Sequence, residues 1–261
     1  MSELLQVAVE AAQEAGKFLK ESVGKVKTVE AKAGEVRNLV SEIDRRSEEK
    51  IIRHIRSRFP AHAILAEESG GDTSPAEYRW IIDPLDGTTN FLHGVPIYSV
   101  TIGVEHGGEV IAGVVYDPKS DELFTAEKGT GAYLNGQRIS VSRTEDLINS
   151  LLVTGFPYDL ESNPYVAEYF VRFLNASRGL RRLGSAALDL AYVAAGRFDG
   201  YWESVLQPWD MAAGVLLVRE AGGTISDFAG GPTSIYQKRI LASNGIIHDD
   251  MVRILSGTRL H

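Results

Sequence analysis

The segment Asp83-Pro84-Leu85-Asp86-Gly87-Thr88-Thr89 restricts what this chain can fold into more than any other stretch. It follows the apolar run Trp80-Ile81-Ile82 and places two carboxylates three residues apart. The proline biases Asp83 toward an extended backbone, and Gly87 can adopt torsion angles that other residues avoid. The pattern therefore predicts the end of a strand, a sharp turn and the start of a helix. Carboxylates and hydroxyls in such a place bind hard cations such as Mg²⁺, and free amides at a helix start bind phosphate.

The composition is that of a folded, acidic protein. The chain has 261 residues, of which 44% are hydrophobic, and this fits one large domain or two packed subdomains. Its net charge of −8 makes direct binding to nucleic acid or to anionic membrane unfavourable. An anionic substrate is still compatible with that charge, because bound cations reverse its local sign. The sequence contains no cysteine, which excludes disulfides and thiolate chemistry.

The sequence also predicts a soluble, cytoplasmic protein that does not enter a membrane. No apolar run reaches the roughly 18 residues that a spanning helix needs. The N-terminal segment has the spacing of an amphipathic helix, and it carries acids where a signal peptide carries a basic region.

Hydrophobic periodicity changes near residue 145 and divides the chain into two halves. In the first half, helices are expected over residues 2–22 and 42–59, and Ser41 with Asp44 has the spacing of a capping box. Strands are expected there at residues 63–66, 79–83, 97–105, 109–117 and 122–127. In the second half, the expected strands at 151–154, 199–203 and 240–243 alternate with helices at 164–176, 185–195, 209–221 and 246–256.

These elements predict an α+β subdomain with an antiparallel sheet over residues 1–144, which would hold most of the metal ligands. Residues 145–261 would form an α/β subdomain that supplies Asp210 and contacts to substrate. The sequence shows no flexible linker between the halves, so we expect them to pack tightly around a site that lies between them.

Four acids stand at expected strand ends or at a helix start: Glu67, Asp83, Asp86 and Asp210. Each alone has an ordinary explanation, as a solvated loop acid, a turn residue or a charge at a helix N-terminus. If they converge, each pair about 5 Å apart repels by roughly 3 kcal/mol at an effective dielectric near 20. The cluster must then bind cations or hold protons, and its oxygen donors favour Mg²⁺, Mn²⁺ or Ca²⁺ over zinc. Two Mg²⁺ would cancel the four charges and support hydrolysis of a phosphate ester.

Three motifs, in this order, resemble the inositol monophosphatase family, which belongs to the Mg²⁺-dependent, lithium-sensitive phosphatases. They are Ala66-Glu67-Glu68-Ser69, the stretch from Trp80 to Phe91, and Pro208-Trp209-Asp210 with the downstream Glu220-Ala221-Gly222-Gly223. The resemblance spans essentially the whole chain, and the stretch from Gly184 to Tyr192 is similar to the bacterial branch. It implies a layered αβαβα sandwich of the sugar-phosphatase type, hydrolysis of inositol 1-phosphate and a homodimer.

The resemblance also implies a role for individual residues. The implied metal ligands are Glu67, Asp83, the carbonyl of Leu85, Asp86 and Asp210. Two or three Mg²⁺ would bind, with Asp83 shared between two of them, a weaker third ion near Glu67 and Mn²⁺ as a possible substitute. One departure from the family pattern is Ala33, which stands where a lysine often lies near the third ion. Lys32 is adjacent, and we assign no role to it.

Catalytic and substrate-binding residues follow from the same resemblance. Asp44 and Thr88 would orient and activate the attacking water. The amides of Gly87 and Thr88 would hold the phosphate. The inositol hydroxyls would contact Asp86, Ala186 and Glu203.

Other functions and signals stay open at this point. Within enzymes, the alternative is a fructose-1,6-bisphosphatase or a broad sugar phosphatase. From another class, the chain could act as a partner of the RNA-synthesis machinery, as some bacterial relatives do. Arg181 and Arg182 could face an anionic substrate, a dimer partner or solvent. The six histidines show no ligand spacing and are expected at the surface or in loops.

Overall fold

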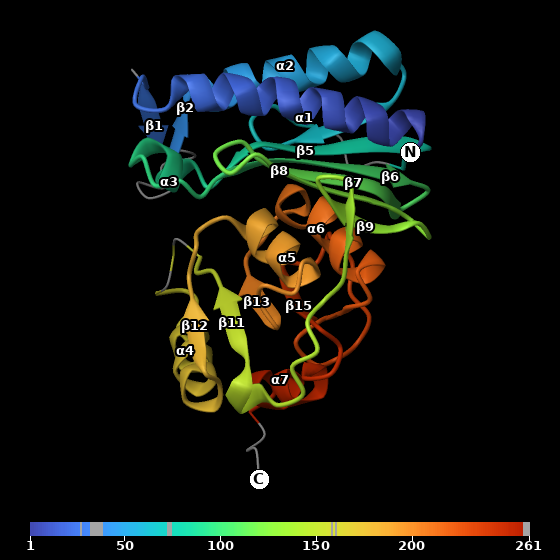
Figure 1. The fold of residues 1–261 in the computed structure, drawn as a ribbon. Helices are drawn as coiled ribbons and strands as arrows, with labels where there is room; N and C mark the ends of the chain where they lie inside the picture. Colours follow the sequence, from blue (N-terminus) through green and yellow to red (C-terminus); the bar gives the residue numbers. More distant parts are fainter. Residues whose placement is uncertain (27, 32–38, 72–74, 158, 160, 258–261) are drawn as a thin grey trace.

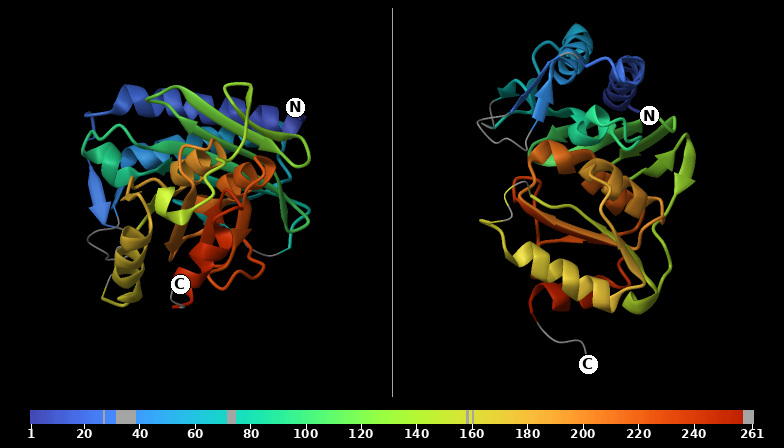
Figure 2. Two further views of the ribbon diagram at one scale, coloured as in Figure 1. Left: turned by 60° about the horizontal axis from the view of Figure 1, so that its bottom comes forward. Right: turned by 90° about the vertical axis from the view of Figure 1, so that its left-hand side faces the viewer.

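Two β-sheets alternate with three layers of helices in this protein (Figure 1). The structure is a computed structural model, and it describes residues 1–26, 28–31, 39–71, 75–157, 159 and 161–257. Lys32 and Ala33 lie outside these ranges. The order of layers is α, β, α, β, α, which is the layered sandwich that the resemblance implies, and two further views show the same stacking (Figure 2).

The first layer consists of α1 (Glu3–Ser22) and α2 (Glu42–Arg58), which pack together on the outer face of the larger sheet. Helix α2 begins at a capping box: the backbone NH of Ser41 donates to the Asp44 carboxylate, and the Ser41 hydroxyl accepts from the helix backbone. A two-stranded ribbon of β1 (Val29–Ala31) and β2 (Leu39–Ser41) leads into this helix. The cap therefore fixes where the helix starts, and with it the position of Asp44.

The second layer is an eight-stranded sheet with the order β10-β9-β8-β7-β6-β5-β3-β4. Neighbouring strands are antiparallel except for β3 and β5, which are parallel. Its strands are β3 (Ala63–Ala66), β4 (Gly70–Gly71), β5 (Tyr78–Asp86), β6 (Ser99–His106), β7 (Glu109–Asp117), β8 (Glu122–Glu127), β9 (Gly131–Leu134) and β10 (Gln137–Ile139).

The middle layer holds α5 (Ala186–Ala194) and α6 (Pro208–Glu220), which are buried between the two sheets. Helix α6 comes close to the larger sheet because both surfaces carry small residues. A Cβ on Gly103 would lie 2.6 Å from Ala212 Cβ, and one on Gly113 would lie 2.9 Å from Ala213 Cα. This contact sets how deep α6 sits, and so it positions the acid at its N-terminus.

The fourth layer is a five-stranded sheet with the order β12-β11-β13-β15-β14, covered on its far side by α4 (Tyr165–Ala176) and α7 (His248–Leu255) (Figure 1). Strand β11 is parallel to β12 and β13, and β15 is antiparallel to β13 and β14. The strands are β11 (Leu151–Thr154), β12 (Gly179–Arg181), β13 (Gly200–Ser204), β14 (Thr224–Ser226) and β15 (Arg239–Ser243). The 3-10 turn η2 (Leu147–Asn149) precedes this sheet.

The expected elements are present, and the differences are local. The short strands β4, β9, β10, β12 and β14 were not predicted. The expected end of a strand at Asp83 is wrong, because β5 continues through Pro84 to Asp86. Asp83 is opposite Thr101 and Asp86 is opposite Ser99, so three steps on β5 face two on β6. This bulge accommodates a proline inside a strand, and the expected turn and helix start follow it, at Gly87 with φ of 92° and at Thr88 in α3 (Thr88–Leu92).

The proposed boundary at residue 144 stays a prediction. The two sheets use residues 63–139 and 151–243, but α6 of the second half packs directly on β6 and β7 of the first. One histidine also differs from expectation. His248 is buried, and its two ring nitrogens are hydrogen-bonded to Ser243 and Ser226. Within the described ranges, the structure has no helix that is both long and apolar enough to cross a membrane.

Candidate active site

A pocket with a volume of about 690 Å³ lies where β5, α3 (Thr88–Leu92), α5 and α6 meet. The predicted metal and substrate residues line it, although they come from both halves of the chain. They are Glu67, Asp83, Leu85, Asp86, Gly87, Thr88, Ala186, Glu203 and Asp210. Asp44 does not line the pocket itself, but its carboxylate is hydrogen-bonded to Thr88, which does. The structure thus brings together every site residue that the sequence predicted.

The bulge in β5 presents two acids to the same pocket. Asp83 Oδ1 accepts a hydrogen bond from the Leu85 amide at 2.9 Å. Asp86 Oδ2 accepts from the Ser185 hydroxyl at 2.5 Å and from the Ala187 amide at 2.8 Å. In a regular strand successive side chains alternate between faces, so residues three apart would point oppositely. The extra residue of the bulge is what lets both carboxylates line one pocket.

Glu67 and Asp210 approach the same pocket from other elements. Glu67 follows β3, and its amide donates to the Ile82 carbonyl at 3.1 Å, which keeps it beside β5. The carboxylate of Glu48 on α2 accepts from the next two amides, those of Glu68 at 2.8 Å and Ser69 at 2.9 Å. Asp210 lies in the first turn of α6 and accepts from the Gln207 amide at 2.7 Å.

Burial and repulsion from neighbouring acids raise the pKa of three of these carboxylates, those of Asp83, Asp86 and Asp210. Burial raises the pKa of Asp83 well above its usual range, and Glu67, Asp86 and Asp210 raise it further. Burial raises the pKa of Asp86 to about 6, although hydrogen bonds from Ser185 and Ala187 offset part of the effect. The pKa of Asp210 is raised well above normal by burial and then by Glu67. The pocket therefore favours protonated acids or bound cations.

The donor set fits hard divalent cations. Four carboxylates and the Leu85 carbonyl offer oxygen atoms only, which Mg²⁺ and Mn²⁺ prefer. In the part of the chain that the structure describes, no group of three or more histidine, aspartate or glutamate side chains is already placed to hold a metal ion. The fit rests on donor chemistry and on the raised pKa values, since a cation would relieve the repulsion that raises them.

Asp44 and Thr88 form a hydrogen-bonded pair at the edge of the acidic pocket. The Thr88 hydroxyl lies 2.9 Å from Asp44 Oδ1 and 3.0 Å from the Leu85 carbonyl. Asp44 is fully buried, and its other oxygen accepts from the amide and the hydroxyl of Ser41. Burial raises the pKa of Asp44, and the bonds from Ser41 and Thr88 lower it in part. The helix cap and the Thr88 contact therefore use different oxygens of one carboxylate.

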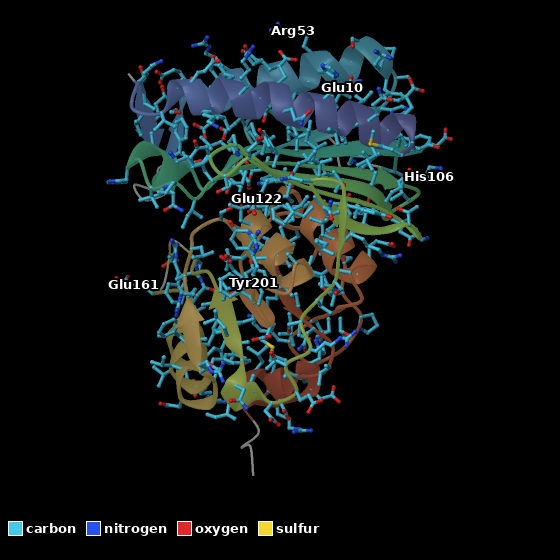
Figure 3. All side chains as sticks on the ribbon, viewed as in Figure 1. Glu10, Arg53, His106, Glu122, Glu161 and Tyr201 are labelled. Atoms are coloured by element: carbon cyan, nitrogen blue, oxygen red, sulfur yellow. The ribbon has the colours of Figure 1, made fainter. Side chains whose placement is uncertain are left out.

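The pocket is also lined by Glu203, Ala186 and two residues without a predicted role there, Asp189 and Arg182. Tyr201 of β13 is labelled in Figure 3, and its hydroxyl donates to Glu203 Oε2 at 2.7 Å. Burial raises the pKa of Glu203 to about 7, and the Tyr201 bond and the charge of Arg182 lower it in part. The sequence left open whether Arg181 and Arg182 face a substrate, a dimer partner or solvent, and of these two Arg182 is the one that lines the pocket.

Sequence reasoning missed Asp189 as a site residue. It falls in the helix expected over residues 185–195, for which the sequence predicts no role at the site. A usable signal was present, because Asp189 is the single charged residue of α5 and stands one turn after Ser185. A lone acid in an otherwise apolar helix that two sheets bury is expected to have a function or a partner.

The five layers and the acidic pocket define a protein of the sugar-phosphatase class. The chain belongs to the inositol monophosphatase family: the family model described by that name matches residues 1–258. An inositol-1-monophosphatase from Mesorhizobium japonicum is 41% identical over 97% of this chain and 96% of its own length. The Nus factor SuhB of Pseudomonas aeruginosa is 43% identical, over 94% of this chain and 92% of its own.

Solved structures agree with this assignment. The inositol monophosphatase from Anabaena (Nostoc) sp. PCC 7120 superposes with a TM-score of 0.88 at 45% identity, covering 98% of this chain and 96% of that one. Family and relatives together support a phosphatase.

Proposed function

We propose that this protein is a Mg²⁺-dependent phosphomonoesterase that hydrolyses inositol 1-phosphate to inositol and phosphate. The observation that carries the proposal is the convergence of four acids from distant segments in one pocket, next to the Thr88–Asp44 pair. The name of the Mesorhizobium relative supports the choice of substrate.

The acidic wall of the pocket would hold the metal ions. The ligands are Glu67, Asp83, the Leu85 carbonyl, Asp86 and Asp210. Two or three Mg²⁺ would bind to these residues. When bound, the ions supply positive charge that attracts phosphate and makes water a stronger acid. Mn²⁺ could replace Mg²⁺, and we expect inhibition by lithium.

Thr88 and Asp44 would prepare the attacking water. The Thr88 hydroxyl can accept a proton from water while it passes its own proton to Asp44 Oδ1, 2.9 Å away. The burial of Asp44, which raises its pKa, makes it a better proton acceptor than an exposed aspartate. The role in capping α2 keeps the carboxylate in place, so the relay has a fixed geometry.

The phosphate and the alcohol would bind at different parts of the pocket. Gly87 has a left-handed backbone with φ of 92°, and its amide and that of Thr88 would hold the phosphate. Asp86, Ala186 and Glu203 would contact hydroxyls of the inositol ring. A carboxylate such as Glu203 can accept from two neighbouring hydroxyls at once.

A sugar bisphosphate is the second candidate substrate. Two exposed cations, Arg182 and Lys238, also line the pocket. They could pair with the second phosphate of a compound such as fructose 1,6-bisphosphate. A panel of inositol 1-phosphate, fructose 1,6-bisphosphate and glycerol 2-phosphate decides between the candidates, and kcat/KM is the quantity to compare.

A partner role is the candidate from another class. The name of the Pseudomonas relative, a Nus factor, supports an interaction with the RNA-synthesis machinery. The net charge of −8 favours a protein partner over direct contact with RNA. We also propose a cytoplasmic homodimer, which light scattering and cell fractionation would test. A protein with only a binding role would release no phosphate from any substrate in the panel.

The test of the metal assignment is phosphate release as a function of Mg²⁺ concentration. Asp86→Asn and Asp210→Asn should each abolish most turnover. Asp199→Asn is a matched control, since Asp199 is a buried acid whose carboxylate accepts from the Ser142 hydroxyl and the Leu151 amide and which lies outside the pocket lining. Wild-type turnover in both pocket variants, or activity that persists in a chelator, would show that the assignment is wrong.

A further inference from the structure

Asp189 is a buried carboxylate in the lining of the pocket. Its side chain is 1% exposed, and it lines the pocket together with Ala186 and Glu203. Among the described residues, neither of its carboxylate oxygens has a hydrogen-bond partner. The neighbouring acids differ in this respect, because Asp86 accepts from Ser185 and Ala187 and Glu203 accepts from Tyr201.

Packing of α5 does not account for an acid at this position. The other buried residues of the helix are alanine, leucine and valine. A buried carboxylate without a partner is among the most unfavourable groups in a protein interior, whereas an apolar residue here would match its neighbours. Burial, followed by the charges of Glu203 and Asp86, raises the pKa of Asp189 well above its usual range. The chain keeps an acid where folding alone disfavours one, which points to a ligand.

The charges around Asp189 restrict which chemical groups of a ligand can bind to it. Besides burial, the charges of Glu203 and Asp86 raise the pKa of Asp189, and the charge of Arg182 offsets only part of that effect, so the immediate surroundings of Asp189 favour a neutral group over a further anion. A hydroxyl group is neutral and both donates and accepts, so it can pair with a carboxylate or with a carboxylic acid. A substrate with several hydroxyls can therefore satisfy Asp189 and Glu203 together.

We infer that Asp189 is a specificity-determining residue, which binds a hydroxyl group of the alcohol part of the substrate and so selects polyol phosphates. This inference deepens the proposed function and rests on it. A site with an unpaired polar group discriminates strongly, because a substrate without the matching hydroxyl leaves that group unsatisfied. Asp189 acts on the alcohol and not on the phosphate, so hydrolysis of a phosphate ester without further hydroxyls does not depend on it.

The experiment compares inositol 1-phosphate with phenyl phosphate, whose alcohol carries no other hydroxyl. Asp189→Ala should lower kcat/KM for inositol 1-phosphate by about ten- to a hundredfold and change that for phenyl phosphate by less than about twofold. Asp189→Asn keeps groups that pair with a hydroxyl and should restore part of the loss. Thermal stability of both variants should equal or exceed that of the wild type, because a buried unpartnered acid is removed.

A binding measurement makes the test independent of turnover. In a Thr88→Val background with Mg²⁺, adding Asp189→Ala should weaken the calorimetric Kd for inositol 1-phosphate by about tenfold and leave that for phenyl phosphate unchanged. Asp199→Asn is the matched control, since its carboxylate is satisfied by Ser142 and Leu151. It should lose stability and keep the ratio of the two kcat/KM values.

Two results overturn the inference while the proposed function stands: equal losses on both substrates, and no loss on either. If the wild type hydrolyses neither compound, the proposed function fails. The role of Asp189 is then tested only by the change in Kd for inositol 1-phosphate compared with that for phenyl phosphate. Equal Kd changes for both compounds would overturn it.

Discussion

The hydroxyl of Thr88 lies 2.9 Å from Oδ1 of Asp44, while Oδ2 of the same carboxylate caps helix α2 through Ser41. One buried side chain therefore joins the outermost helix layer to the pocket. Because the helix cap and the Thr88 contact use different oxygens of Asp44, mutations can test separately the effect on stability of α2 and the effect on catalysis.

Removal of the Thr88 hydroxyl should reduce turnover with little loss of fold. We expect Thr88→Val to lower kcat by about 10²–10⁴-fold, the range for a lost general acid or base. Thr88→Ser is the matched control and should keep most of the activity, since it retains the hydroxyl that bonds to Asp44. Steady-state kinetics with saturating Mg²⁺ measures both. Full activity in Thr88→Val would exclude the relay.

Stability of the metal-free protein should fall as pH rises. Folding raises the pKa of Asp86 from 3.8 to about 6 and that of Glu203 from 4.5 to about 7. The folded state then binds more protons than the unfolded state between these values, so the free energy of unfolding decreases from about pH 4 to pH 7. Thermal unfolding in chelator at several pH values measures the slope.

Mg²⁺ should reverse that loss, because it binds the ionised carboxylates. We expect the ion to raise Tm more at pH 7 than at pH 5, and an equal ionic strength of NaCl to have a much smaller effect. A Tm that climbs steadily from pH 4 to pH 7 without metal would contradict the electrostatic account of the pocket.

Gly155 leaves space for the Glu203 carboxylate. A Cβ at residue 155 would lie 2.1 Å from both carboxylate oxygens of Glu203. Gly155→Ala should displace Glu203 and raise KM for inositol 1-phosphate by roughly tenfold, with a smaller effect on phenyl phosphate. In contrast, a Cβ on Gly179 meets nothing nearer than 3.5 Å, so Gly179→Ala is the matched control. Similar kinetics for the two variants would argue against a substrate contact by Glu203.

Glu48 should affect the affinity for metal although it does not line the pocket. Its carboxylate binds the amides of Glu68 and Ser69 and so fixes the loop that carries Glu67. We expect Glu48→Ala to weaken Mg²⁺ binding by about 10–100-fold, the usual effect of losing a group that supports a ligand. Glu49→Ala, at the exposed neighbouring position, should have no effect. Titration calorimetry with Mg²⁺ compares them, and equal affinities would show that the loop holds its position without Glu48.

Local patterns were sufficient to predict most of the helices and the longer strands. The capping box of α2, Pro208 at the start of α6 and the periodic apolar faces are each readable within a few residues. The short strands β9, β10, β12 and β14 were missed, because strands of three or four residues depend on hydrogen bonds from partners elsewhere in the chain. For the same reason the bulge in β5 could not be read from Asp83 and Asp86 alone.

The sequence by itself determined the family, the layered fold and the acids of the pocket, since ordered motifs and residue types carry that information. The tertiary structure decided the surroundings of each side chain. Asp44 is hydrogen-bonded to Thr88, the Glu203 carboxylate occupies the space left by the missing Cβ of Gly155, and Asp189 has no hydrogen-bond partner among the described residues. The physical reason is burial. Whether a carboxylate is solvated, paired or isolated depends on elements far away in the chain, and that environment sets its pKa and its chemistry.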